Sequence, residues 1–421
     1  MTLARHLREL LALTRGQKNL RVLAASGALA TVASGALNPL LPGYLQSRGL
    51  DLQRIGLVFT VASLVPIVAQ PALGALSDRA SRKHLVVGLS LASALLLLAF
   101  PLLTGAVALG LVIALRLTLA RAEEPVSSAM VADIAPPTQR ATSFALLDSV
   151  TQLAYVASLL ASSALVALLG VTGVFAAGSV LLATAALLLL RLKETPPARR
   201  DTPRVSWRET WRGVMTPWVS LRHKRGAAPL FAYQLFLSFA LALYPLYVPL
   251  FALQLGAPQT MIGPLIAASW LVFALLQPAG GRLSDRTAGR KGVATLGLWG
   301  MVACSALLGL CGLLPRPHAL WALAAAWVLL AVPDALFRPA AQALVVELAP
   351  EGERGQLFGA LGSVGSLAGA VAPLAYGVVA TRASLGAAFL VSSACFVLAL
   401  VALLRLDEPA PVPLPNPEPQ R

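Results

Sequence analysis

Long apolar stretches separated by short polar segments dominate the chain. Each is close to the roughly 20 residues that a helix needs to cross a bilayer. The twelve stretches fall at 22–46, 55–76, 85–104, 107–132, 141–168, 172–190, 228–252, 262–281, 293–314, 320–347, 356–380 and 387–405. Helices satisfy all their backbone hydrogen bonds within one segment, which a spanning element must do in lipid. The pattern therefore predicts an all-α membrane protein with twelve transmembrane helices.

Composition and charge support this interpretation. The chain is 57% hydrophobic and only 12% charged, whereas soluble domains are about 25% charged. The formal net charge of +15 would suit a nucleic-acid partner, but most Lys and Arg fall in segments on one side of the predicted membrane. That asymmetry is the positive-inside pattern. It places both chain ends in the cytoplasm, argues against nucleic acid, and favours contact with anionic lipids.

Polar connections divide the chain into five parts. A basic cytoplasmic segment at 1–21 precedes a first bundle of six helices at 22–190, and a linker at 191–227 precedes a second bundle at 228–405. The tail at 406–421 is rich in proline, and we expect it to be disordered.

The linker contains a short amphipathic pattern. Trp207, Trp211, Val214 and Trp218 fall near one helical face, which predicts an interfacial helix with Trp at headgroup depth. A solvated linker is the alternative, because Pro217 and the short run weaken the pattern.

The two halves of the chain repeat one another. Six residues recur 207 positions later: Gln70, Pro71, Gly74, Ser77, Asp78 and Arg79 return as Gln277, Pro278, Gly281, Ser284, Asp285 and Arg286. Four more pairs share that spacing: Pro42, Gly49, Ile55 and Gly56 return as Pro249, Gly256, Ile262 and Gly263. A repeat of this length indicates two pseudo-symmetric six-helix units with the same orientation, an arrangement found in secondary transporters.

The repeated motif carries a family resemblance. The sequence Gly-x-x-x-Asp-Arg between the second and third predicted helices, followed by basic residues, resembles motif A of the major facilitator superfamily of transporters. The segment from Asn38 to Pro42 resembles the helix 1 pattern of its drug-efflux branches. The fifth predicted helix departs from the drug–proton antiporters, since it lacks their Gly-Pro-rich motif. The resemblance implies two six-helix bundles that expose a central site alternately to each side.

The resemblance also implies a charge network at the cytoplasmic rim. It would hold the two halves closed there when the protein faces outward. Its members would be Gly74, Asp78, Arg79, Arg82 and Asp133 in the first half, and Gly281, Asp285, Arg286, Arg290 and Glu347 in the second. Positive-inside basicity with turn chemistry is the alternative. It explains the basic residues, but not an Asp repeated at a fixed distance from Gly.

Two predicted helices carry charges inside apolar spans. The fourth contains Arg116, Arg121, Glu123 and Glu124, and the tenth contains Asp334 and Arg338. Each charge would cost about 3 kcal/mol if it faced lipid near the bilayer centre. We therefore expect them to face protein or water, or to lie near an interface. The resemblance implies that the first, fourth, seventh and tenth helices line the central cavity, with these charges along the substrate path.

Local neutralisation is the alternative for these charges. Asp334 and Arg338 are four residues apart, and Arg121 and Glu124 are three apart, so each pair can form within its own helix. The adjacent carboxylates Glu123 and Glu124 disfavour each other's ionisation. One of the two carboxylates is therefore a candidate proton carrier.

Further polar and aromatic residues are candidates for the substrate path. Asn38 lies in the first helix, and Asp148, Gln152 and Tyr155 form a polar stripe on the fifth, which lines the cavity unless Asp148 simply sits near the cytoplasmic end. Tyr244 and Tyr247 share a face of the seventh helix, where they form either an aromatic cavity wall or an interfacial belt.

These features favour a secondary transporter in the plasma (inner) membrane. We expect a monomer that exports small amphipathic organic molecules, including drugs, in exchange for protons. A sugar or metabolite importer is the alternative among transporters. A membrane sensor or a membrane-embedded enzyme is the alternative of another class, but the sequence shows no large soluble output domain, nucleotide loop, metal cluster or nucleophile constellation. Cys304 and Cys311 are two helical turns apart, about 10 Å, which is too far for a disulfide. No cofactor is expected.

The charge network yields a testable prediction. Asp78→Asn removes the repeated carboxylate while keeping its size, so it should weaken closure of the cytoplasmic rim and reduce transport. Double electron–electron resonance between labels on the two halves measures the conformational bias. Unchanged transport together with an unchanged bias would contradict the network.

Overall fold

The computed structural model describes residues 18–77, 81–103, 105–134, 140–192, 227–286, 290–316, 318–348 and 354–406. The predicted interfacial helix of the linker, the tail after 406 and most of the basic segment at 1–21 lie outside these ranges. Apart from short turns, the described residues are helical, and they contain no strand. This confirms the predicted all-α fold.

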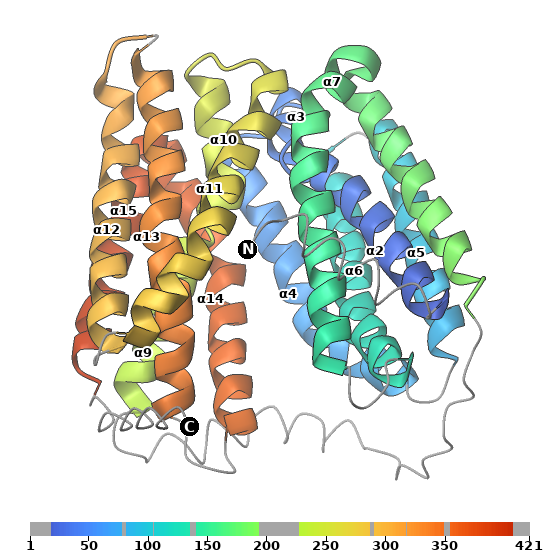
Figure 1. The fold of residues 1–421 in the computed structure, drawn as a ribbon. Helices are drawn as coiled ribbons and strands as arrows, with labels where there is room; N and C mark the ends of the chain where they lie inside the picture. The colour runs from blue at the N-terminus through green and yellow to red at the C-terminus, as the bar shows by residue number, and fades with distance from the viewer. Residues whose placement is uncertain are drawn as a thin grey trace, which may run out of the picture.

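Two groups of helices lie side by side, and each comes from one half of the chain (Figure 1). The first half contains α2 (Lys18–Leu37), α3 (Leu41–Ser47), α4 (Leu52–Ser77), α5 (Arg82–Ala99), α6 (Ala106–Ile134) and α7 (Arg140–Leu189). The second half contains α9 (Ala227–Leu241), α10 (Tyr244–Gln254), α11 (Gln259–Arg286), α12 (Arg290–Leu310), α13 (His318–Leu348), α14 (Arg354–Arg382) and α15 (Leu385–Leu404). Short 3-10 turns, η1 (Phe100–Leu102) and η3 (Cys311–Leu313), extend α5 and α12.

Every predicted span corresponds to a helix or a broken helix. The first span is α2 with α3, and the seventh is α9 with α10. Both breaks precede a proline, Pro42 or Pro245, which lacks the backbone N–H that a continuous helix needs. The fifth and sixth spans run together as α7, where Gly170 turns the chain with φ of 66°. In the described part of the chain, nine helical segments are individually long and apolar enough to cross a membrane.

Equivalent contacts stabilise the two halves. Lys83 Nζ donates to the carbonyl of Leu192, just beyond α7, at 2.8 Å. Lys291 Nζ donates to the carbonyls of Leu404 and Leu406, at the end of α15, at 2.9 and 2.6 Å. Each lysine thus satisfies carbonyls left open at a helix C-terminus, where a cation is favoured. The two halves of the predicted repeat therefore share the same lysine–carbonyl contact.

All three cysteines are buried, and none forms a disulfide.

The two halves meet mainly at one end of the molecule. We call this the short-loop end, because it carries the short turns at 48–51, 255–258 and 383–384. Here α3 contacts α10, α4 contacts α14, and α7 contacts α11. The opposite end, where α2 begins and α15 finishes, is called the linker end. The two bundles diverge toward the linker end (Figure 1).

Two repeat-related glycines permit the close approach at the short-loop end. A Cβ at Gly56 of α4 would collide with the Pro373 carbonyl oxygen of α14. A Cβ at Gly263 of α11 would collide with the Ser162 hydroxyl and the Leu159 carbonyl of α7. Small residues at such crossings let helix backbones pack closely in a membrane.

A hydrogen bond joins the halves at the first crossing. The backbone N–H of Leu374 donates to Thr60 Oγ1 of α4 at 3.0 Å. Beside it, Tyr247 donates its hydroxyl to the Pro373 carbonyl at 2.6 Å. Polar groups therefore meet their partners within the apolar crossing, and the short-loop end is closed by both packing and hydrogen bonds.

Gly56→Ala tests this closure. The added methyl group meets a backbone carbonyl that cannot swing away, so we expect a loss of about 1–3 kcal/mol from the closed arrangement. Labels on Asp51→Cys and Thr381→Cys, read by double electron–electron resonance, should move apart. Gly88→Ala is the matched control, because nothing lies within 4 Å of a Cβ at that position. Equal label distances in both variants would contradict the proposed role of Gly56.

Candidate functional site

A cavity of about 500 Å³ lies between the two halves. Both halves line it: α6 and α7 contribute from the first, and α10, α11 and α13 from the second. The breaks in the first and seventh spans also reach it, through Asn38 and Ala242. The cavity is large enough for a small organic molecule, and such sites are mostly apolar with a few placed polar groups.

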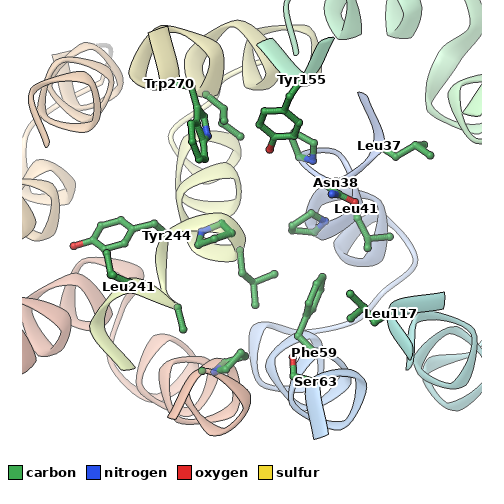
Figure 2. Close-up of a pocket in the computed structure, with 18 of the residues that line it drawn as sticks. Leu37, Asn38, Leu41, Phe59, Ser63, Leu117, Tyr155, Leu241, Tyr244 and Trp270 are labelled. Atoms are coloured by element: carbon green, nitrogen blue, oxygen red, sulfur yellow. The ribbon is translucent and has the colours of Figure 1, made fainter. Parts of the chain in front are cut away.

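Aromatic side chains form much of the wall. Tyr155 of α7 meets Trp270 of α11 edge-on, with ring centroids 5.7 Å apart. The two side chains come from opposite halves and lie next to each other in Figure 2. On the second half, the Tyr244 ring stacks on Trp327 at 5.7 Å. Phe273 lies edge-on to Trp270 at 5.9 Å. The wall is therefore a set of flat apolar surfaces with polar edges.

Among the described residues, three charged side chains also line the cavity: Arg116 from α6, and Asp334 and Arg338 from α13. Arg338 Nε donates to Asp334 Oδ1 at 2.8 Å, which makes an ion pair within one helix. The Arg338 guanidinium also lies over the Phe273 ring, 5.1 Å from its centroid. Asp334 and Arg338 thus neutralise each other within α13 and also line the cavity. Arg116 Nη2 lies 3.4 Å from Ser34 Oγ of α2.

The remaining described candidates differ in position. Asn38 and Tyr244 both belong to the cavity lining, but the Tyr244 side chain points away from the space between the halves, with its hydroxyl 3.4 Å from Ser392 Oγ (Figure 2). Tyr247 does not line the cavity, because it is fully buried in the contact with Pro373. Gln152 is exposed on α7 and is not part of the lining. Sequence spacing could not separate Tyr244 from Tyr247, since their different surroundings come from α14 and α15.

Glu123 lies outside the cavity lining. Its carboxylate interacts with the Ser90 hydroxyl of α5, so it sits between α5 and α6. No cation among the described residues forms an ion pair with it. It lies seven residues from Arg116, about 10 Å along the same helix.

Other candidates have no described side chain. Asp78 and Arg79 lie outside the described residues. The helices include the following residues, but their side chains are not described: Gly74, Arg121, Glu124, Asp133, Asp148, Asp285, Arg286 and Glu347. Arg82 and Arg290 begin α5 and α12 at equivalent places on the linker end, and Gly281 lies near the end of α11.

Most of the described lining was not among the sequence candidates, including the aromatic residues Phe59, Trp270, Phe273 and Trp327. Trp327 precedes Asp334 by seven residues on α13, which places both on one face, and that spacing was a usable signal. Trp270 and Phe273 belong to the eighth span, which the resemblance did not assign to the cavity. The indole N–H of Trp327 is shielded from solvent and has no acceptor among the described residues.

These observations define a multi-pass membrane protein with a central cavity between two pseudo-symmetric bundles. The family model of the Major Facilitator Superfamily matches residues 23–286 and 230–421. The chain therefore belongs to this superfamily of transporters. No relative was found by sequence among the curated proteins.

Solved structures share the fold. A mutant of the nucleoside transporter NupG matches with a TM-score of 0.76 and 16% identity, over 92% of this chain and 99% of that one. A POT family transporter in complex with 5-aminolevulinic acid matches at 0.72 and 12% identity, over 92% and 96%. The human organic anion transporter MFSD10 (TETRAN) matches at 0.60 and 19% identity, over 91% and 98%. At these identities the likeness concerns the fold alone.

The ion pair on α13 can be tested by stability measurements. Removing one member leaves the other charge unpaired in the cavity wall, and its partial exposure reduces the loss to about 1–2 kcal/mol. We expect Asp334→Asn and Arg338→Gln each to lower the unfolding temperature in detergent. The double variant should recover part of the loss.

A matched control is available on the surface. Asp51 and Arg54 form an ion pair at 3.6 Å with both side chains more than half exposed. Neutralising that pair should change stability by less than about 0.5 kcal/mol. Single α13 variants as stable as the wild type would show that the pair contributes nothing.

Proposed function

We propose that this transporter moves small amphipathic organic molecules by alternating access, and that it exports them in exchange for protons. The observation that carries the proposal is the central cavity, which has walls from both halves and a largely aromatic and apolar lining. Rocking the halves about such a site exposes it to each side in turn. The solved structures named above include a nucleoside transporter and an organic anion transporter, which is consistent with an organic substrate.

The composition of the cavity favours an amphipathic substrate over a sugar. Each buried hydroxyl of a sugar needs a hydrogen-bond partner, and the described lining offers few uncharged polar side chains, among them Asn38, Ser63 and Ser269. Flat aromatic surfaces instead suit a molecule with an apolar ring. Uptake of a polar metabolite is therefore the weaker alternative.

The proposed topology places the linker end in the cytoplasm, according to the distribution of Lys and Arg. In that orientation, the conformation closed at the short-loop end faces inward. The motif around Asp78 and its copy around Asp285 then lie on the cytoplasmic rim, where they would close the linker end in the opposite state. We place the protein in the plasma (inner) membrane as a monomer, in contact with anionic lipids.

Glu123 supports the proposed proton coupling. An intramembrane carboxylate without a paired cation is most stable when it is protonated. Asp334 differs, because Arg338 stabilises its charge at 2.8 Å. Glu123 also lies on the same helix as Arg116. A change in the charge of Glu123 therefore alters the electrostatic potential at Arg116 in the cavity wall. Its neighbour Glu124 is the second candidate carrier.

Flux measurements test both parts of the proposal. Proteoliposomes with an acidic interior should accumulate an organic probe that exchanges for protons, whichever way the protein is inserted. Ethidium, 2-naphthalenemethanol and 2-naphthoate represent cationic, neutral and anionic amphipathic probes. We expect at least one of them to enter faster than into empty liposomes.

The carboxylate variants separate transport from coupling. Glu123→Gln or Glu124→Gln should abolish accumulation against a gradient while leaving downhill flux, and Asp51→Asn is the control for loss of a surface carboxylate. If both Gln variants still accumulate the probe when a pH gradient is imposed, these residues do not couple protons. If no probe crosses with the wild type, the assigned substrate class is wrong.

A further inference from the structure

Arg116 is a cation of the cavity wall without a paired carboxylate among the described residues. Its hydrogen bond among the described residues is long: Arg116 Nη2 lies 3.4 Å from the neutral hydroxyl of Ser34. No described carboxylate lies within 4.0 Å of it. On its own helix the acids Glu123 and Glu124 lie about two turns away, roughly 10 Å by helical rise. A charge in such a place is costly unless something compensates it.

The described residues of the second half do not supply a free carboxylate for Arg116. Asp334 is the carboxylate of the described lining, and it is already bound to Arg338 on its own helix. Arg338 is further held by the Phe273 ring. The three charges of the described lining therefore sum to one positive charge.

The position of Arg116 also fits ligand binding. It lies on α6 in the first half, whereas Tyr244 and Trp327 line the cavity from the second half. Tyr155 and Trp270 close the gap between the halves. A molecule with an anionic group at one end and a flat ring at the other would contact the guanidinium and the aromatic wall together. A guanidinium binds a carboxylate with two parallel hydrogen bonds.

We propose that the cavity binds an amphipathic monocarboxylate, with its carboxylate on Arg116 and its apolar ring against the aromatic wall. One negative charge matches the single uncompensated positive charge of the described lining, whereas a phosphate monoester would bring a second charge without a partner. The inference rests on the proposed function and specifies its substrate class. It concerns binding, so it can be tested without transport.

The test compares four probes that share one ring system. Calorimetric titration of the purified full chain at pH 7.5 would use 2-naphthoate, 2-naphthalenemethanol, 2-naphthylmethylamine and 2-naphthyl phosphate. We expect 2-naphthoate to bind at least tenfold more tightly than each of the others. Equal affinity of the naphthoate and the alcohol would overturn the proposal, and so would tighter binding of the amine or the phosphate.

Variants of the arginine locate the effect. Arg116→Gln should weaken naphthoate binding at least tenfold and change the affinity for the alcohol less than twofold. Arg116→Lys should keep part of the preference, because the charge remains while the two-pronged geometry is lost. Arg54→Gln is the matched control, since it removes a positive charge at the exposed short-loop end. A preference that survives in Arg116→Gln would place the anion elsewhere.

Stability gives a second readout for the same variants. Removing an uncompensated charge should raise the unfolding temperature of ligand-free Arg116→Gln above that of the wild type, and 2-naphthoate should stabilise only proteins with a cation at position 116. If Arg116→Gln does not fold, the arginine is structural and the proposal fails unless Arg116→Lys folds and keeps the preference.

The two proposals can fail separately. If the protein carries ethidium or the alcohol but does not bind 2-naphthoate, the transport proposal stands and the proposal of a monocarboxylate ligand fails. Tight naphthoate binding that needs Arg116, without flux of any probe, supports the anion site and overturns the transport proposal.

Discussion

The close approach of the two halves at the short-loop end is the constraint on which the rest depends. Gly56 against Pro373 and Gly263 against Ser162 allow helices of opposite halves to touch, and the Leu374 amide meets Thr60 at the first crossing. With this end closed, divergence of the bundles toward the linker end follows (Figure 1). The two glycines are equivalents in the repeat, so both crossings use the same residue type at the same place. Contacts based on shape and single hydrogen bonds are also the kind that a rocking motion can break and remake.

Charge placement follows a second constraint, set by the low polarity of the membrane interior. Every charged side chain there needs a partner, water or a proton. The described residues show three different solutions. Asp334 and Arg338 neutralise each other on α13, Glu123 has a hydroxyl partner between α5 and α6, and Arg116 faces the cavity. These differences assign the three groups different chemistry, although all of them are simply intramembrane charges in the sequence.

Much of the fold was predictable from the sequence because the bilayer imposes it. Apolar length predicted the twelve spans, and the spacing of 207 residues predicted the two related halves. Prolines such as Pro42 and Pro245 mark where the first and seventh spans break, because proline cannot donate the helical hydrogen bond. The turn between the fifth and sixth predicted spans falls at Gly170, between residues 168 and 172 as expected, with a φ of 66° that suits glycine.

The site was predictable only in part. By itself, the sequence determined which helices carry charge and that such charges must avoid lipid, because the cost of exposing them to hydrocarbon does not depend on the detailed packing. Tertiary structure alone decided that Arg116 faces the cavity while Glu123 turns toward Ser90. It also decided that Tyr244 lines the wall while Tyr247 seals a crossing, and that Trp270 joins the site from the eighth span. These outcomes depend on the neighbours that packing brings from distant parts of the chain, and helical spacing carries no record of them.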